Sequence, residues 1–256
     1  MTRAHRPLLP QFLRIAHRGA SGHAPENTLA AFRLALELGT DALELDLHQT
    51  RDSRIIVIHD HTVDRTTNGH GRVDELTWAE IHRLDAGAWF DARFRGERVP
   101  RLEEVLELVA PTAVRLLIEI KSHGDPTHPV ATARQAAHLI QQAGLRARTT
   151  FLCFDARVLE ALQGTRPVVE TCWLVKKVPA RVVPGLQKIG ARYLAPHWSA
   201  VTGRLVEKLH GAGYPLIIWT VDAPPVMKRL LRLGVDAIAS NFPERLNAVL
   251  APARSR

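Results

Sequence analysis

The alternation of hydrophobic and polar positions is most regular between Asp41 and Asp60. Leucine occupies positions 43, 45 and 47, and Glu44, Asp46 and His48 each follow one of these leucines. Because successive side chains of a strand point to opposite faces, this spacing predicts a strand over residues 41–48 with one apolar and one polar face. Two carboxylates on one strand face form a site of hard oxygen ligands, which suits Mg²⁺ or Ca²⁺.

A second apolar run, residues 55–58, predicts a strand that pairs with the first. We expect a two-residue hairpin turn at Asp52-Ser53, which makes the pair antiparallel and sets His59 directly across from Asp46. An acid-base group then lies beside a candidate metal site. An exposed antiparallel ribbon has the same alternation, so this segment alone does not distinguish the two interpretations.

The rest of the chain alternates between short apolar strands and helices with apolar residues at helical spacing. The first helix is expected to have Asn27 as its N-cap and to end at Gly39. The other expected strands are residues 12–16, 115–121, 149–153, 168–174, 192–195, 216–220 and 236–239. The other expected helices are residues 102–109, 128–143, 156–163, 180–188, 203–211, 225–233 and 244–250.

The number of parallel strands determines the expected architecture. A parallel connection needs a crossover of about a dozen residues or more, so residues 55–58 follow the preceding strand too closely to be parallel to it. The remaining strands and helices make eight βα units, which predicts a (β/α)8 TIM barrel, with a doubly wound sheet as the alternative. Residues 60–99 form an insertion after the second strand, with one short helix opened by a Thr77-x-x-Glu80 capping box.

Composition narrows the class of protein. With 256 residues, of which 46% are hydrophobic, the chain can form one barrel domain over residues 1–256. The net charge of +8 invites a nucleic-acid interpretation, but the positive residues are dispersed, so we expect no nucleic-acid partner and a surface that favours small anionic substrates. No apolar run approaches the roughly 18 residues of a transmembrane helix, and no signal peptide is evident, so we expect no stable membrane insertion.

Cys153 and Cys172 are the only cysteines, and they fall on separate expected strands. This pattern favours two buried free thiols and a cytoplasmic location, because disulfide frameworks are rare in reducing compartments. The oligomeric state is left open by the sequence.

Polar residues gather at the ends of the expected barrel strands, where (β/α)8 barrels carry their active groups. On these strands, or on the hairpin beside them, lie His17, Arg18, Glu44, Asp46, His59, Glu119, Lys121 and Trp219. The three carboxylates suit a divalent cation, and the cation, Arg18 and Lys121 can neutralise charge on a phosphate. The two histidines can act as base and acid near neutral pH. The set therefore predicts phosphoryl chemistry.

A series of short motifs, in order along the chain, resembles the glycerophosphodiester phosphodiesterase family, and in particular its short cytosolic bacterial members. The motifs are His17-Arg18-Gly19, Pro25-Glu26-Asn27-Thr28, Glu44-Leu45-Asp46, His59-Asp60, Asp64-Arg65-Thr66-Thr67-Asn68-Gly69, Leu84-Asp85-Ala86-Gly87, Pro100-x-Leu102-Glu103-Glu104-Val105, Glu119-Ile120-Lys121 and Trp219-Thr220-Val221. The resemblance runs from about residue 14 to about residue 246. Each motif alone is weak, but their order and spacing together are highly specific.

The resemblance implies a barrel of the phosphatidylinositol-phospholipase-C-like type that hydrolyses glycerophosphodiesters to an alcohol and sn-glycerol 3-phosphate. It implies that His17 and His59 are the acid-base pair and that a divalent cation, Mg²⁺, Ca²⁺ or Mn²⁺, is bound by three carboxylates. The implied binding residues are, for the metal, Glu44, Asp46 and Glu119, and, for the substrate, Arg18, Lys121 and Trp219. The resemblance does not establish which histidine is the base in the first step.

The chain departs from the family pattern at several positions, and other functions are compatible with part of the motif set. Ser53 stands where the family has Gly, Cys153 where Ser is common, and Asn241 where Asp is common, which puts any hydroxyl role and one contact near the site in doubt. A lysophospholipase D-type phosphodiesterase acting on lysophospholipids is the nearest alternative. A metal-dependent sugar isomerase and a non-catalytic basic module are the others, but neither needs His17, Arg18 and Lys121 together.

Overall fold

The computed structural model describes residues 11–122, 127–164 and 169–251. Its strands follow the predicted ones to within about two residues at each end. They are β1 (Leu13–His17), β2 (Ala42–Gln49), β3 (Ile55–Val57), β4 (Arg115–Ile120), β5 (Thr149–Cys153), β6 (Glu170–Val175), β7 (Tyr193–Pro196), β8 (Ile217–Ile218) and β9 (Ala237–Ser240).

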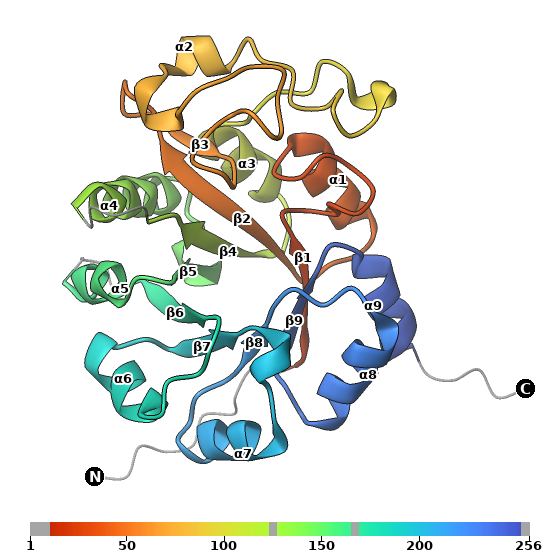
Figure 1. Cartoon of the computed structure of the whole chain (residues 1–256), viewed down its shortest axis with the longest axis vertical. Helices are drawn as coiled ribbons and strands as arrows, with labels where there is room; N and C mark the ends of the chain where they lie inside the picture. The colour runs from red at the N-terminus through yellow and green to blue at the C-terminus, as the bar shows by residue number, and fades with distance from the viewer. Residues whose placement is uncertain (1–10, 123–126, 165–168, 252–256) are drawn as a thin grey trace, which may run out of the picture.

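Eight of these strands are parallel neighbours in the order β7-β6-β5-β4-β2-β1-β9-β8. The first and last members of this order meet through two parallel bridges, Leu194 with Leu216 and His197 with Trp219, so the sheet is a nearly closed barrel. Figure 1 shows the strands meeting at the centre with the helices around them. The predicted (β/α)8 barrel is confirmed, and the doubly wound alternative is wrong.

The helices agree equally well with the predicted ranges. Within the described chain they are α1 (Leu29–Glu37), α2 (Trp78–Ile81), α3 (Leu102–Val109), α4 (Thr127–Gln142), α5 (Ala156–Gln163), α6 (Val182–Ile189), α7 (Gly203–Gly211), α8 (Pro224–Arg232) and α9 (Pro243–Leu250). None of them is both long and apolar enough to cross a membrane.

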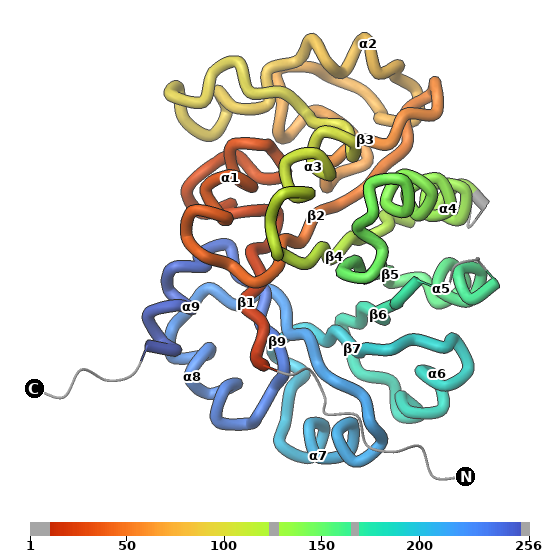
Figure 2. The backbone as a smooth tube through the Cα atoms, turned by 180° about the vertical axis from the view of Figure 1, so that it is seen from behind, coloured from red at the N-terminus to blue at the C-terminus, as the bar shows by residue number. Residues whose placement is uncertain are grey.

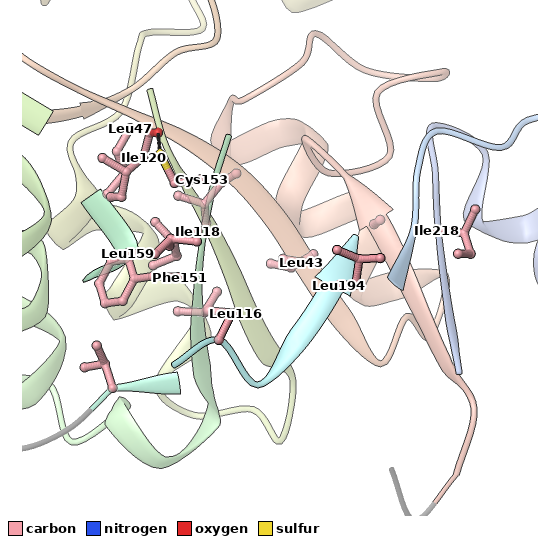
Figure 3. Packing of buried hydrophobic residues seen from close by; sticks show 14 of the residues in the cluster. Leu43, Leu47, Leu116, Ile118, Ile120, Phe151, Cys153, Leu159, Leu194 and Ile218 are labelled. Atoms are coloured by element: carbon pink, nitrogen blue, oxygen red, sulfur yellow. Dashed lines mark hydrogen bonds between the residues drawn. The ribbon is translucent and has the colours of Figure 1, made fainter. Parts of the chain in front are cut away.

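The main hydrophobic core lies between the outer face of the strands and the helices. Figure 3 shows Ile118, Ile120 and Phe151 of β4 and β5 packed with Leu159 of α5. Cys153 belongs to this layer, and its thiol donates a hydrogen bond to the carbonyl oxygen of Ile120 at 3.2 Å. Both cysteines are free and buried, as predicted, and burial raises the pKa of the Cys153 thiol to about 12.

A second apolar layer fills the inside of the barrel. It consists of the inward-facing side chains of the lower strand positions, which are Leu13, Ile15, Ala42, Leu117, Leu152, Cys172, Leu174, Tyr193, Ala195, Ile217, Ala237 and Ala239. Because strand side chains alternate, the next inward position toward the carboxyl end of each strand lies above this apolar floor. These upper positions include His17, Glu44 and Glu119.

The hairpin is antiparallel, as predicted, but its predicted register is wrong by one residue. Gln49 pairs with Ile55 and Leu47 with Val57, so Ile58, and not His59, lies across from Asp46. The cause is a three-residue loop in place of the predicted two-residue turn. The amide of Ser53 bonds to the carbonyl oxygen of Thr50, and Ser53 has a left-handed φ of 60°, which adds one residue to the connection.

The insertion between β3 and α3 has its own small core. Figures 1 and 2 show it, with α2, at one edge of the barrel beside β3. The predicted capping box is present, since Thr77 accepts from the Glu80 amide and the Glu80 side chain accepts from the Thr77 amide. The buried residues of this lobe are Ile56, Ile58, Val63, Val73, Ile81, Ala86 and Val99. Trp89 is exposed and lies outside this cluster.

Candidate active site

A cavity of about 280 Å³ opens at the carboxyl ends of the barrel strands. It is lined by seven of the eight residues that the sequence singled out, namely His17, Arg18, Glu44, His59, Glu119, Lys121 and Trp219. Asp46, the eighth, is fully buried beside them. The remaining lining residues are Leu117, Leu152, Phe154, Leu174, Lys176, Ala195, Ile217, Thr220 and Ala239.

Glu44, Asp46 and Glu119 form one cluster. Their candidate ligand oxygens lie within 4.8 Å of one another, and β2 and β4 bring them together because Asp46 and Glu119 are paired in the parallel register. Burial raises the pKa of Glu44 well above its usual range, and repulsion from the other two carboxylates adds to this. Burial likewise raises the pKa of Glu119 to about 7. Negative charge is therefore concentrated at this point.

Two cations border the cluster. The ammonium of Lys121 lies 2.9 Å from Asp46 Oδ1 and 2.7 Å from Glu119 Oε1. Arg18 Nε lies 3.3 Å from Asp46 Oδ2, and the Arg18 amide donates to Glu44 Oε2 at 3.0 Å. Burial raises the pKa of Asp46, but Lys121 and Arg18 outweigh this and hold it below its usual range.

The backbone directly after β1 is turned so that Arg18 folds back over the cluster. Arg18 has a φ of 55° and Gly19 a φ of 80°, both in the left-handed region. A Cβ at Gly19 would come within 2.6 Å of the Ala31 backbone, so only glycine fits there. The His-Arg-Gly motif therefore combines one acid-base group, one cation and the turn that orients it.

The donor set fits a divalent cation. Asp46 Oδ1 is buried and has no hydrogen-bond donor among the described residues, although the Lys121 ammonium is close to it. Three buried carboxylates with one such oxygen offer the hard ligands that Mg²⁺, Mn²⁺ and Ca²⁺ prefer. A cation here would also relieve the repulsion that raises the pKa of Glu44.

His17 is held by a chain of buried polar groups. Its Nδ1 lies 2.7 Å from Asn241 Oδ1, and Asn241 Nδ2 in turn donates to Asp222 Oδ2 at 2.7 Å. Since an amide oxygen only accepts, Nδ1 of His17 carries the proton and Nε2 has a free lone pair. Nε2 lies 3.4 Å from Thr220 Oγ1. Burial lowers the pKa of His17 to about 4, with a further contribution from Arg18, so the ring is neutral near pH 7.

His59 has a carboxylate partner instead. Its Nδ1 lies 2.6 Å from Asp60 Oδ1, and Asp60 also accepts from Arg65. Arg65 also donates a hydrogen bond to Glu26. Glu26 in turn accepts a hydrogen bond of 2.9 Å from the Arg18 guanidinium. Burial lowers the pKa of His59, whereas the hydrogen bond to Asp60 opposes that shift. This geometry gives Glu26 a supporting role toward Arg18.

Asn27 was expected to cap the first helix, and that prediction is wrong. Thr28 is the N-cap, and Asn27, at a φ of 58°, turns its side chain into the site. Its Nδ2 donates to Asp46 Oδ2 at 2.8 Å, which fixes the orientation of that carboxylate. The helix begins one residue later than expected because asparagine tolerates the left-handed region better than threonine.

The part of the cavity at the ends of β5, β7 and β8 is aromatic. Trp219 is fixed by a hydrogen bond from Nε1 to the carbonyl oxygen of Ala195 at 2.8 Å. Its ring centroid is 5.5 Å from that of Phe154 and 5.3 Å from that of His197. Phe154 is 38% exposed and stands at the rim.

Several further residues at the site were not predicted as functional residues from the sequence, among them Asn27, Phe154, Lys176, Thr220, Asp222 and Asn241. Phe154 and Lys176 each follow the last residue of a strand, as do the predicted residues, so the same positional rule would have found them. Asn241 also follows a strand, but its partner Asp222 lies in a loop and has no local signal. Cys153 points into the outer core, so the doubt about a hydroxyl at that position does not concern the cavity.

Fold and site together define an enzyme class: a barrel hydrolase with histidines, cations and clustered carboxylates around one cavity, suited to phosphoric diesters. A sequence profile of the Glycerophosphoryl diester phosphodiesterase family matches residues 17–245. The chain is 38% identical to a glycerophosphodiester phosphodiesterase of Caldanaerobacter subterraneus subsp. tengcongensis, over 91% of this chain and 95% of the relative. It is 32% identical to a glycerophosphodiester phosphodiesterase of Bacillus subtilis, over 93% and 86% of the two chains.

Solved structures agree. An Oleispira antarctica phosphodiesterase, in complex with the product sn-glycerol-3-phosphate, superposes with a TM-score of 0.87 at 28% identity, covering 94% of this chain and 97% of that one. A glycerophosphodiester phosphodiesterase from Agrobacterium tumefaciens superposes with a TM-score of 0.78 at 33% identity, covering 91% and 98%. The chain therefore belongs to the glycerophosphoryl diester phosphodiesterase family, and it is a phosphoric diester hydrolase.

Proposed function

We propose that the protein hydrolyses glycerophosphodiesters to an alcohol and sn-glycerol 3-phosphate, with a divalent cation held by Glu44, Asp46 and Glu119. The observation that carries the proposal is the convergence of these carboxylates with two histidines and two cations in one cavity. The product named for the Oleispira antarctica phosphodiesterase supports the same reaction here. When bound, the cation would act as a Lewis acid that stabilises charge on the phosphate oxygens.

Arg18 and Lys121 are the proposed phosphate-binding residues. Both line the cavity and both contact the carboxylate cluster, so each is oriented before substrate arrives. Preorganised cations stabilise the charge that develops in a phosphoryl transition state without further reorganisation.

His17 is the proposed base of the first step. His17 lines the cavity, and its Nε2 carries the lone pair because Asn241 holds the proton on Nδ1. A glycerol hydroxyl gives its proton to Nε2 as its oxygen forms a bond to phosphorus. The Thr220 hydroxyl, 3.4 Å from Nε2, helps to orient the ring or the nucleophile.

His59 is the proposed acid. Asp60 accepts from Nδ1 and stabilises the imidazolium, as the carboxylate does in a serine-protease triad. The bond from phosphorus to the leaving oxygen breaks while Nε2 of His59 donates its proton to that oxygen. In the second step the roles reverse: His59 takes a proton from water, water opens the cyclic phosphate, and His17 returns its proton to the glycerol oxygen.

Trp219 is the proposed contact for the glycerol carbons, since its ring is fixed in the wall of the cavity. The cavity volume of about 280 Å³ favours a small water-soluble diester over a lysophospholipid, whose acyl chain needs an extended apolar groove. A cytoplasmic location is part of the proposal, and the two buried free thiols support it.

The test is an enzyme-coupled assay for glycerol 3-phosphate release with Mg²⁺, Mn²⁺ or Ca²⁺ present, and again after addition of chelator. We expect release that chelator abolishes and that falls by at least about a hundredfold in His17→Ala and His59→Ala. The control is His138→Ala, because His138 lies on the exposed side of α4, away from the cavity. Full activity of either active-site variant contradicts the proposed acid-base pair.

A further inference from the structure

Lys176 lines the active-site cavity but has no part in the proposed reaction. It is the first residue after β6, two positions beyond Leu174, which also lines the cavity, so the strand period directs it inward at the rim. Around the barrel, β6 is four strands from β1 in either direction. Lys176 therefore lies across the mouth of the barrel from His17 and Arg18.

The charge of Lys176 is not compensated by a neighbour within the described chain. The carboxylates that line the cavity are Glu44 and Glu119, and both belong to the cluster on β2 and β4. Glu119 is already paired with Lys121. Between β5 and β8, the other lining residues near Lys176 are apolar or aromatic. Among the described lining residues, this side of the cavity consequently has one positive charge and no negative one.

The direction in which the leaving group departs follows from the positions of the two histidines. In an in-line displacement, the attacking and leaving oxygens lie on opposite sides of phosphorus. His17 is on β1, which pairs with β9, and β9 pairs with β8, the strand that leads to Trp219. His59 follows the hairpin on β2, whose other neighbour is β4. On this basis we place the leaving alcohol, protonated by His59, on the β2–β4 side of phosphorus, from which the rim leads over β5 to β6.

We propose that Lys176 binds a negative charge on the leaving alcohol, and that the preferred substrates are glycerophosphodiesters whose headgroup carries a phosphate or a carboxylate. The inference rests on the proposed function. An ammonium donates charge-assisted hydrogen bonds to either anion, and Lys176 is exposed at the rim of the cavity, where the charge of a headgroup can reach it. The same charge repels an ammonium headgroup such as choline or ethanolamine.

An aromatic wall can also bind an ammonium group by cation–π contact, so the two preferences need to be separated. Here the Trp219 ring is flanked by Phe154 and His197, and no carboxylate stands on that side of the cavity within the described residues. The positive charge of Lys176, two strands from β8 around the rim, opposes such a contact. The aromatic wall around Trp219 is therefore suited to the glycerol carbons, and Lys176 binds the charged group of the headgroup.

The experiment compares two matched pairs of substrates. Glycerophosphoserine differs from glycerophosphoethanolamine by a carboxylate, and glycerophosphoinositol 4-phosphate differs from glycerophosphoinositol by a phosphate. The ratio of kcat/KM within each pair is measured for the wild type and for Lys176→Met, Lys176→Arg and Lys177→Met. Lys177 is the control, because it is exposed, adjacent in sequence and absent from the cavity lining.

We expect the wild type to favour the more anionic member of each pair by about tenfold, mainly through KM, which is the effect of one charge-assisted hydrogen bond. Lys176→Met should bring both ratios close to one, whereas Lys176→Arg and Lys177→Met should retain them. A wild-type preference for ethanolamine, or ratios that Lys176→Met leaves unchanged, overturns the inference. If Lys176→Met changes the kcat/KM ratio of only one pair, Lys176 binds the carboxylate (the serine pair) or the phosphate (the inositol pair). Failure of the proposed function is distinguishable, since none of the four diesters would then be hydrolysed.

Discussion

Asn241 Oδ1 lies 2.7 Å from His17 Nδ1, although 224 positions separate the two residues in the chain. The β1–β9 pairing brings them together, since His17 ends one strand and Asn241 follows the other. Asp222 fixes the amide by accepting from both the side-chain and the backbone nitrogen of Asn241. An amide in this place determines the tautomer of His17 without adding charge beside it.

The substitution Asn241→Asp should move the acidic limb of the pH dependence of kcat/KM to higher pH. Burial and Arg18 now hold the pKa of His17 at about 4, and the base must be neutral to act. A carboxylate at hydrogen-bond distance favours the charged imidazolium, so the pKa of His17 should rise by at least about one pH unit. The measurement is the profile of kcat/KM across the acid range.

The new carboxylate in this variant would also face Asp222, which lies 2.7 Å from the amide nitrogen it replaces. The double variant Asp222→Asn with Asn241→Asp keeps one charge in the pair and moves it to His17. It should show the same displaced limb with better stability than Asn241→Asp alone. An acidic limb that stays at the wild-type pH in both variants would mean that His17 is not the base.

Glu44→Gln should stabilise the protein in chelator while removing its response to divalent cations. Burial and two neighbouring carboxylates raise the pKa of Glu44 in the folded protein. A carboxyl with a raised folded pKa contributes its stability below the unfolded pKa of about 4.3 and loses it as pH rises through the folded value. Glutamine stays neutral, so its advantage should grow with pH and reach on the order of 1 kcal/mol near neutrality.

Thermal unfolding in chelator, and then with Mg²⁺ or Ca²⁺, tests both parts of that prediction. The wild-type Tm should rise on addition of cation, because binding to the folded state alone stabilises it. Glu44→Gln should show a higher Tm in chelator and little further rise. The control is Glu107→Gln on the exposed side of α3. A Glu44→Gln protein that is less stable in chelator at neutral pH contradicts the predicted repulsion.

Lys121→Met should have the opposite effect on stability. Its ammonium lies within 3 Å of both Asp46 and Glu119, and its side chain is only 8% exposed. Removing one partner of a buried ion cluster leaves its carboxylates uncompensated and costs about 3–5 kcal/mol. A divalent cation then replaces part of the missing positive charge, so the Tm rise on adding cation should exceed that of the wild type. Equal rises in the two proteins would argue that the cation binds elsewhere.

The barrel could be predicted from the sequence because hydrophobic period and turn residues act locally. Leu43, Leu45 and Leu47 all point to the outer core, as the alternation required, and this left Glu44 and Asp46 facing inward. The site residues followed because parallel strands end at the same rim. The contact of Asn241 with His17 was not predictable in this way, since it depends on the three-dimensional register of strands far apart in sequence. The reach of Asn27 to Asp46 depends in addition on a left-handed backbone that no local pattern specified.

The register of the β2–β3 hairpin was mispredicted because Ser53 extends the loop to three residues. Ser53 adopts a φ of 60° at the third position of the loop, a conformation that costs a non-glycine residue about 1 kcal/mol. Glycine has no such penalty there, but it loses more backbone freedom on folding, so the net stabilisation from Ser53→Gly should be about 0.5 kcal/mol. The hydrogen bonds at this position are made by backbone atoms of Ser53, and one of them is accepted by its carbonyl oxygen from the Gln135 side-chain amide. They are therefore retained in Ser53→Gly.

Urea unfolding should show a higher midpoint with an unchanged slope, and kcat/KM should stay the same because the hairpin already holds His59 in place. Ser53→Ala is the matched control, which keeps the left-handed penalty, and a midpoint equal to that of Ser53→Gly would show that the serine backbone is not strained.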